Sequence, residues 1–382
     1  MRVRCVVFLS VMASLPLDGA EKVPGYLVDD FESGDRIAKS GAAWMPLCDA
    51  VIGGASTVRL SVAGAPGRRA LRAEGSIAAN GFAGTWVALD REARAVDLKS
   101  FRAIRLRLRG TGDWAVGLRA GSAQMDNFLA PVSGSDVWTS VEIPLAVLRP
   151  RQGDNGPDLG EVRWLGVQSL PGRSGDFTLE IDDVELIGAA RPSSPHGNAM
   201  ATRIRRTPAS ALGAAKWKAL GTDPAGDGKV ATLPDVVALA SWSEADVVWF
   251  RVSLAAPPGA AFGVNLAFDV DGDPTNGRPW WGVNTAFRFD RLVSVWVFDT
   301  TEETFEGTIG IASADDAMQG RAIDPSFGVP RVAVDAAARE ISIGVPRAVL
   351  GGVGSVRVLA AVGSPMRHND DLPDVGAITF EP

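Results

Sequence analysis

Histidine, cysteine and long apolar runs are scarce in this chain of 382 residues, which holds two histidines and two cysteines. His196 and His368 lack the spacing of a zinc site, and no G-x-S-x-G elbow or phosphate-binding glycine loop accompanies them. The sequence therefore predicts a protein that is not an enzyme. Beyond the N-terminus no segment approaches the ~18 consecutive apolar residues of a membrane helix. We expect no integral membrane insertion, although peripheral association with a membrane is compatible with the sequence.

The chain also has no excess of basic residues. Its 38 Lys and Arg residues against 45 Asp and Glu residues give a formal net charge of −7. A nucleic acid is therefore not an expected partner, because polyanion binding needs a basic surface. The 43 glycines and 24 prolines favour short strands joined by turns over long helices.

Residues 1–20 have the order of a secretory signal peptide. Two arginines precede the apolar stretch Val6–Leu17, and small residues follow, ending at Ala20. The alternative is an ordinary buried strand at the N-terminus. Export predicts a secreted or periplasmic protein. Cys5 would leave with the signal, so Cys48 alone would remain and no intramolecular disulfide is expected.

The length suits two domains, and a composition change shows where they meet. Residues 191–210 are rich in Pro, Ser and Ala, lack acidic residues and have no apolar period. This pattern is typical of a linker. We predict one domain over residues 24–190 and a second over residues 211–382.

Both halves have the two-residue period of β-strands. In the first half, Ile104, Leu106 and Leu108 alternate with three arginines, which predicts one buried face and one basic face. One interpretation of that basic face is a contact with an anionic glycan or phosphate. The favoured alternative is a solvated face, which acidic residues of adjacent strands can neutralise. In the second half, about ten such runs lie between turn residues, and one short helix is expected at Ala209–Leu220. The predicted fold class is all-β, with two tandem β-sandwich (jelly-roll) domains.

The first half resembles a known family. The segment WMPLCDAVIGGAS carries Trp44, Asp49, Gly53, Gly54 and Ser56, and the segments DDFES, DLKSFRAIRLRLRGTG, VWTSVEIPLAVLRP and GDFTLEIDDVEL follow the family order. These motifs resemble the complex I intermediate-associated protein family over about residues 26–188. The resemblance implies a galactose-binding-like jelly roll. It also implies an alternative role as an assembly factor, because mitochondrial members are assembly chaperones for respiratory complex I.

The second half is similar, more loosely, to the family 9 carbohydrate-binding module and related extracellular sandwich domains. The similarity covers about residues 217–381 and rests on three segments. They are the TDPAGDGK opening with Asp223 and Asp227, the pairing of DVVWFRVSL with FGVNLAFDVDGD, and the later FRFDRLVSVWV. This resemblance implies that carbohydrate is the ligand.

Asp49 and Ser56 flank a Gly-Gly pair in the first half. Adjacent glycines permit unusual backbone angles, and short Asp and Ser side chains bond exposed loop amides. One interpretation is a ligand-binding lip formed by Asp49 and Ser56. The alternative is a loop that caps itself.

Alternate acids in DVDGDPTNG predict a metal site. Asp269, Asp271, Asp273 and Asn276 are oxygen donors of the kind that calcium prefers. The segment is not an EF-hand, because Pro274 replaces the glycine needed at the sixth position. The alternative is a plain acidic turn.

Trp280 and Trp281 follow in the same loop and are predicted to bind a ligand. Aromatic rings near carboxylates suit a sugar, whose apolar ring face stacks while acids take its hydroxyls. The alternative for either tryptophan is a place in the core. Together, these features predict an exported, non-catalytic binding or scaffold protein for carbohydrate or another extracellular ligand, with calcium as a structural ion. The second hypothesis is an assembly factor with protein partners.

Overall fold

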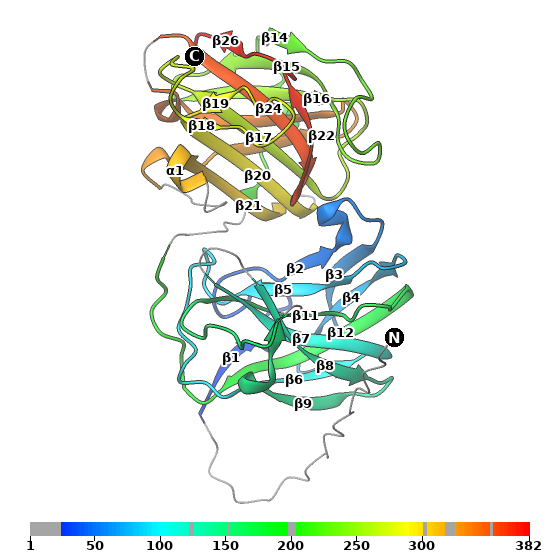
Figure 1. Cartoon of the computed structure of the whole chain (residues 1–382). Helices are drawn as coiled ribbons and strands as arrows, with labels where there is room; N and C mark the ends of the chain where they lie inside the picture. The colour runs from blue at the N-terminus through cyan, green and yellow to red at the C-terminus, as the bar shows by residue number, and fades with distance from the viewer. Residues whose placement is uncertain are drawn as a thin grey trace, which may run out of the picture.

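The computed structural model confirms the all-β prediction and shows two β-sandwiches in succession along the chain (Figure 1). The structure describes residues 24–121, 126–150, 153–197, 204–300, 304–317, 325–351 and 354–382. The predicted signal peptide, residues 1–20, lies outside the described residues. In the described part, no helix has the length and apolar character needed to cross a membrane.

The first sandwich has two antiparallel sheets. One sheet has the strand order β3-β4-β12-β6-β9, with β1 paired to β12, and the other has the order β10-β8-β7-β11-β5-β2. The strands of the first sheet are β1 (Gly25–Asp29), β3 (Thr57–Ala63), β4 (Ala70–Ile77), β6 (Ala103–Arg109), β9 (Thr139–Pro144) and β12 (Gly175–Ile187). Those of the second are β2 (Met45–Cys48), β5 (Ala83–Ala88), β7 (Gly112–Ala120), β8 (Asp126–Gly134), β10 (Arg149–Pro150) and β11 (Val162–Ser169). The 3₁₀ turns η1 (Asp49–Ile52) and η2 (Leu145–Val147) follow β2 and β9.

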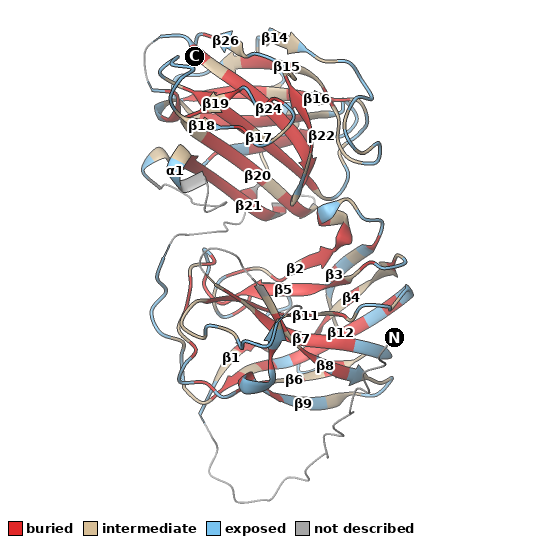
Figure 2. Ribbon diagram, viewed as in Figure 1, coloured by how far each residue is buried: buried red, intermediate tan, exposed pale blue. Residues whose placement is uncertain are grey.

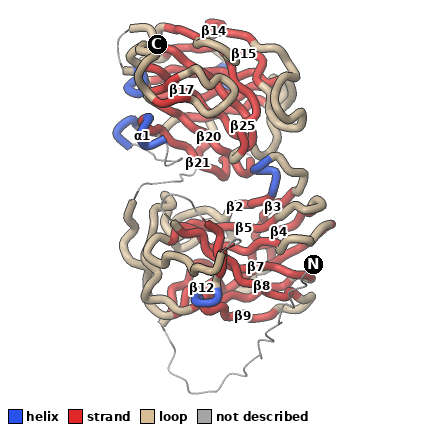
Figure 3. The backbone as a smooth tube through the Cα atoms, in the orientation of Figure 1, coloured by secondary structure: helices blue, strands red, loops and turns tan. Residues whose placement is uncertain are grey.

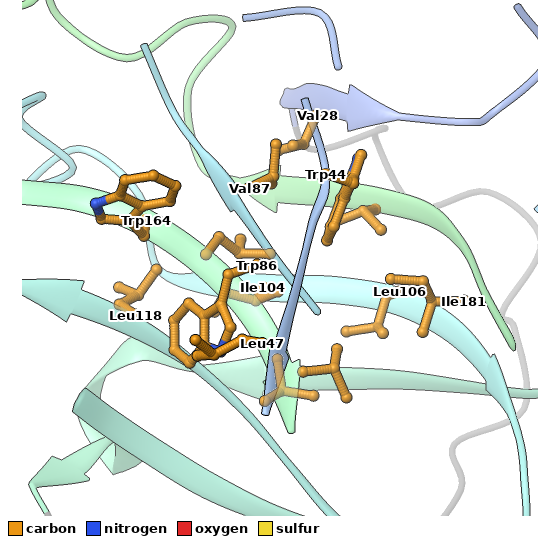
Figure 4. Close-up of a cluster of buried hydrophobic side chains, with 14 of the residues drawn as sticks. Val28, Trp44, Leu47, Trp86, Val87, Ile104, Leu106, Leu118, Trp164 and Ile181 are labelled. Atoms are coloured by element: carbon orange, nitrogen blue, oxygen red, sulfur yellow. The ribbon is translucent and has the colours of Figure 1, made fainter. Parts of the chain in front are cut away.

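Strand β6 shows how alternation creates the core. Its leucines and isoleucine are at most 1% exposed and belong to the core of the first sandwich. Figure 4 shows Ile104 and Leu106 among the buried side chains. The arginines between them lie on the other face. There Arg105 pairs with Glu142 at 2.8 Å, and Arg107 pairs with Asp182 at 3.4 Å. The basic face is therefore paired with acids of neighbouring strands, as the solvated-face alternative expects.

The second sandwich also has two sheets, ordered β13-β21-β20-β17-β24-β25, with β26 paired to β24, and β14-β15-β16-β23-β22. The first holds β13 (Ile204–Arg205), β17 (Phe262–Asp269), β20 (Arg291–Thr300), β21 (Thr304–Ser313), β24 (Val356–Ser364), β25 (Arg367–Leu372) and β26 (Ile378–Phe380). The second holds β14 (Lys218–Thr222), β15 (Val236–Ser243), β16 (Val247–Leu254), β22 (Arg331–Asp335) and β23 (Glu340–Pro346). A small ribbon adds β18 (Arg278–Pro279) and β19 (Arg288–Phe289). Figure 2 shows buried residues along the strands of both sandwiches.

The helix expected at Ala209–Leu220 is wrong. The structure has one 3₁₀ turn there, η3 (Ala209–Leu212), and strand β14 begins at Lys218. Gly213, a poor helix former, ends the turn. Strand β14 then forms backbone hydrogen bonds with β15, which a helix over these residues could not make. The remaining helical pieces are as short: α1 (Ala314–Ala317), η4 (Pro325–Phe327) and η5 (Arg347–Leu350) (Figure 3).

Both ends of the predicted linker, residues 191–210, bond to the sandwiches. The amide of His196 donates to the carbonyl of Ala95 at 2.9 Å, which holds this end against the first sandwich. At the other end, β13 pairs with β21 of the second sandwich. Residues 198–203 between them lie outside the described residues.

Candidate functional site

The two adjacent tryptophans occupy different environments in the loop between β18 and β19. Trp280 is 2% exposed, whereas Trp281 is 49% exposed. Their ring centroids lie 4.3 Å apart with planes inclined at 31°. Phe289 of β19 supports both rings from the edge, at 6.0 Å from Trp280 and 5.6 Å from Trp281. The structure therefore corrects the ligand-binding prediction for Trp280, which is a buried support, and leaves Trp281 open to solvent.

Asp371 of strand β25 fixes this pair. One oxygen, Oδ2, accepts hydrogen bonds from Trp280 Nε1 at 2.8 Å, from the Val283 amide at 2.6 Å and from the Asn284 amide at 2.9 Å. The other, Oδ1, lies 2.5 Å from Nε2 of His368. Asp371 is 0% exposed. Hydrogen bonds to a buried carboxylate are short and strong, so the loop is held in one conformation.

Gly282 allows this close approach. A Cβ at this position would lie 2.3 Å from Trp280 Nε1, 2.5 Å from Asp371 Oδ2 and 2.7 Å from His368 Nε2. These distances are too short for any side chain. Only glycine at position 282 therefore allows Trp280, Asp371 and His368 to pack this closely together.

A second loop joins the same surface. The side-chain amide of Asn284 donates to the carbonyls of Pro373 at 2.8 Å and Gly376 at 2.9 Å. This loop presents Val375, which is 82% exposed, and Val283 beside Trp281 is 38% exposed. Trp281, Val283 and Val375 are exposed on these two loops, which Asn284 ties together, and we call the three residues the Trp281 surface.

Asp374 adds a carboxylate between Pro373 and Val375. Burial raises the pKa of Asp374, and the charges of Asp227 and Asp371 raise it further. The Trp281 surface thus has a polar group at its border. An aromatic face with a nearby hydrogen-bonding group can bind an amphipathic ring.

The predicted calcium ligands do not all converge. Carboxylate oxygens of Asp269, Asp271 and Asp290 lie within 4.8 Å of one another, and Asp290 is a residue that the sequence prediction missed. Asp273 instead accepts a hydrogen bond from the hydroxyl of Thr275 at 2.7 Å. The prediction for Asp273 as part of this cluster is therefore corrected.

Asn276 points its amide nitrogen, not its oxygen, at the acids. Nδ2 donates to Asp271 Oδ2 at 2.8 Å, so Asn276 is a hydrogen-bond donor in this turn. Bonds from the Asp273 amide and from Asn276 lower the pKa of Asp271, and bonds from Thr275 lower the pKa of Asp273. Asp269 caps the Gly272 amide at 2.7 Å and pairs with Arg357. The turn is thus stabilised by its own side chains, as the turn alternative predicts.

A second acidic cluster lies near the TDPAGDGK segment. Oxygens of Asp223, Asp227 and Asp370 lie within 4.8 Å of one another. Burial, followed by the charges of Asp370 and Asp227, raises the pKa of Asp223 to about 7. Burial also raises the pKa of Asp370 to about 6. Asp223 and Asp227 lie close together in the TDPAGDGK segment, whereas Asp370 belongs to β25, far along the chain.

The Gly-Gly segment of the first half caps itself. Asp49 Oδ1 accepts from the Ser56 amide at 2.8 Å, and Ser56 Oγ accepts from the Ala78 amide at 2.9 Å. Asp49 is 8% exposed and Ser56 is 1% exposed. A ligand cannot reach these side chains in this conformation, so the ligand-binding prediction for Asp49 and Ser56 is corrected to a capping role.

The same segment contacts the second sandwich. The carbonyl of Val51 accepts from Ser364 Oγ at 2.7 Å and from the Met366 amide at 2.8 Å. Arg367 Nη1 donates to the carbonyl of Ile52 at 3.4 Å. The turn η1 is therefore part of the junction between the two sandwiches, a role that the sequence did not reveal.

Some solved structures are similar to this chain. The family 11 carbohydrate-binding module of a cellulosomal cellulase of Clostridium thermocellum is 17% identical, with 44% of this chain and 97% of that chain covered and a TM-score of 0.36. The family 30 module of another cellulosomal cellulase of Clostridium thermocellum is 18% identical, with coverage of 44% and 92% and a TM-score of 0.29. No curated protein matches the chain.

The family model of complex I intermediate-associated protein 30 (CIA30) matches residues 30–181. The WMPLCDAVIGGAS segment and the strands β2 to β11 fall inside this range. The recognition predicted from the sequence motifs is thereby confirmed, and this part of the first sandwich is similar to the complex I intermediate-associated protein 30 family.

Proposed function

We propose that this protein is an exported, non-catalytic binding protein that recognises carbohydrate through the Trp281 surface. The observation that carries the proposal is the 49% exposure of Trp281 on a base of buried Trp280 and Asp371. The large indole ring of Trp281 is exposed to solvent, whereas the adjacent indole of Trp280 is buried. Such an exposed apolar patch with polar neighbours is typical of a binding site.

The chemistry of the surface suits a sugar ring. The apolar face of a pyranose can stack on the indole of Trp281, and the Asp374 carboxylate can accept bonds from its hydroxyls. Because hydrogen bonds to Asp371 already fix the loop, little conformational entropy is lost on binding. His368 faces Asp371 and helps to position the loop.

Affinity electrophoresis of the full chain through gels with β-glucan, xylan or galactan tests the proposal. We expect at least one polysaccharide to retard the wild type. Trp281→Ala should weaken that binding about tenfold or more, because an anchor residue contributes more than about 1.4 kcal/mol. Trp138→Ala, a half-buried tryptophan of the first sandwich, is the matched control and should bind normally. No retardation by any polysaccharide would refute the proposal.

We also propose that calcium binds Asp269, Asp271 and Asp290, whose oxygens converge. Carboxylates are the ligands that calcium prefers. EDTA should then lower the melting temperature of the wild-type chain, because an ion bound to the folded state stabilises it. Asp271→Ala should remove this sensitivity, whereas Asp335→Ala on β22 should keep it. Identical melting curves with and without EDTA would contradict calcium binding and support the alternative of a turn stabilised by its own side chains.

The second candidate function is an assembly factor for a membrane protein complex. The CIA30 match over residues 30–181 favours this function, because the resemblance to that family implies a role in the assembly of a membrane complex. Pull-down of the full chain from its native compartment should then recover subunits of a membrane complex. Recovery should survive Trp281→Ala, which separates this function from carbohydrate binding.

A further inference from the structure

Five aspartates lie together beside the Trp281 surface. We call them the acidic border: Asp223, Asp227, Asp235, Asp370 and Asp374. Oxygens of Asp223, Asp227 and Asp370 lie within 4.8 Å of one another. Burial raises the pKa of Asp223, and the charges of the other four aspartates raise it further. Within the described residues none of the five forms an ion pair, so no basic side chain neutralises them directly.

Asp374 connects the acidic border to the Trp281 surface. Asn284, in the loop of the two tryptophans, donates to the carbonyls of Pro373 and Gly376, which lie on either side of Asp374. The charge of Asp227 acts on the carboxyl of Asp374 and raises its pKa. The acids and the exposed indole therefore belong to neighbouring, mutually fixed loops, and one extended ligand can contact both.

The charge of the acidic border decides which class of sugar suits this surface. Its carboxylates repel the carboxylates of a uronic acid polymer, and they offer a neutral sugar hydrogen bonds without charge attraction. An ammonium group is attracted to carboxylates and donates its N–H groups to them in charge-assisted bonds, which are stronger than neutral ones. Asp227 is exposed and Asp374 is half-buried, so both are open to such a group.

We propose that the Trp281 surface and the acidic border together select polymers of amino sugars whose amines are free and protonated. This inference rests on the proposed function, because the stacking of a sugar ring on Trp281 is common to both. One pyranose packs on the indole, and ammonium groups of the same polymer donate to Asp374 and Asp227. Every unit of such a polymer carries an ammonium group, so one of them meets the acids wherever along the polymer the stacked ring lies.

Isothermal titration calorimetry of the full chain tests the proposal with chitosan, chitin and cellulose oligosaccharides of equal length. The three share their ring and linkage and differ in one substituent, which is an ammonium, an acetamide or a hydroxyl group. A weakly acidic buffer keeps the amine protonated. We expect the chitosan oligosaccharide to bind about fivefold tighter than the other two, the share of one exposed ion pair. Added salt should reduce this advantage, because it screens exposed charges.

Asp227→Asn removes one charge of the acidic border and should reduce the advantage of chitosan without changing the affinity for the cellulose oligosaccharide. Asp246→Asn is the matched control and should keep the advantage. Strand β15 begins at Val236, which bonds Asp370, and Asp246 is exposed in the hairpin at its other end. Trp281→Ala should weaken the binding of all three oligosaccharides.

Equal affinity for the three oligosaccharides overturns this inference and leaves carbohydrate binding intact. A preference for chitosan that survives high salt or Asp227→Asn overturns it as well, because the acidic border would then not be its cause. If none of the three binds, the inference also fails, and retardation in the polysaccharide gels then decides separately whether the proposed function holds.

Discussion

At the scale of single residues, the surroundings of each carboxylate decide its role. Asp371 is fully buried, and three N–H groups and His368 lie within hydrogen-bond distance of its carboxyl oxygens. Asp223 is the opposite case. Its Oδ2 is buried without a hydrogen-bond partner in the described part of the chain, and Asp227 and Asp370 lie near it. Its charged form is therefore disfavoured in the folded state.

This difference predicts a pH dependence of stability. The pKa of Asp223 is raised from 3.8 to about 7 on folding. Between these values the unfolded chain has released the proton and the folded chain still holds it, so stability falls as pH rises. We expect the melting temperature of the full chain to be higher near about pH 5 than near about pH 8. Asp223→Asn should flatten this decline, and Asp335→Asn should not. An equally steep decline in Asp223→Asn would contradict the assignment.

The tryptophans of the Trp281 surface were visible in the sequence, but their roles were not. Period-2 alternation assigns faces on a strand, whereas Trp280 and Trp281 lie in a loop where that rule does not hold. Asp371 is 91 residues beyond Trp280 along the chain and accepts the hydrogen bond of its indole through the fold of β25. No local pattern connects them. The same holds for Asp290, which joins Asp269 across a strand pair.

At the scale of elements, strands were predictable because burial follows alternation. The run of β6 alternates clearly, and the strand lies where the alternation predicts it. The predicted helix at Ala209–Leu220 failed because local composition was weighed without the partner strand β15. Loops were harder still. The Asp49–Ser56 loop was identified correctly as a special segment, yet its contact with the turn between β24 and β25 depends on the whole fold.

The loop of the Trp281 surface gives a prediction at this scale. Gly282→Ala should reduce carbohydrate binding although both tryptophans remain, because its Cβ would lie 2.3 Å from Trp280 Nε1 and force the loop to move. Overpacking of this kind costs about 1–3 kcal/mol, so urea unfolding should shift modestly. Gly156→Ala is the control, since a Cβ there meets nothing within 4 Å. Normal binding by Gly282→Ala would show that the loop geometry is not needed.

At the scale of the whole molecule, the sequence predicts two sandwiches but not how they meet. The described residues that line the junction come from β2, β5, β7 and β11 of the first sandwich and from β20 and β21 of the second, and most are ordinary apolar or aromatic residues of strands. Nothing in their spacing distinguishes a residue that faces the other sandwich from one that faces its own core. Phe298 illustrates this. It belongs to β20 of the second sandwich but packs with the core of the first.

Phe298 therefore tests whether the two sandwiches stabilise each other. Phe298→Ala would open a space beside Trp86 and Trp164, and truncating a buried phenylalanine costs up to about 3–5 kcal/mol. Because the lost contacts belong to the first sandwich, amide hydrogen exchange should accelerate in Met45–Cys48, outside the mutated domain. Exchange in β9, on the other sheet, should change little. Val329→Ala, at a residue 59% exposed, is the control. If exchange in Met45–Cys48 stayed at the wild-type rate, the sandwiches would be independent units, and the junction would contribute nothing to the stability of the first.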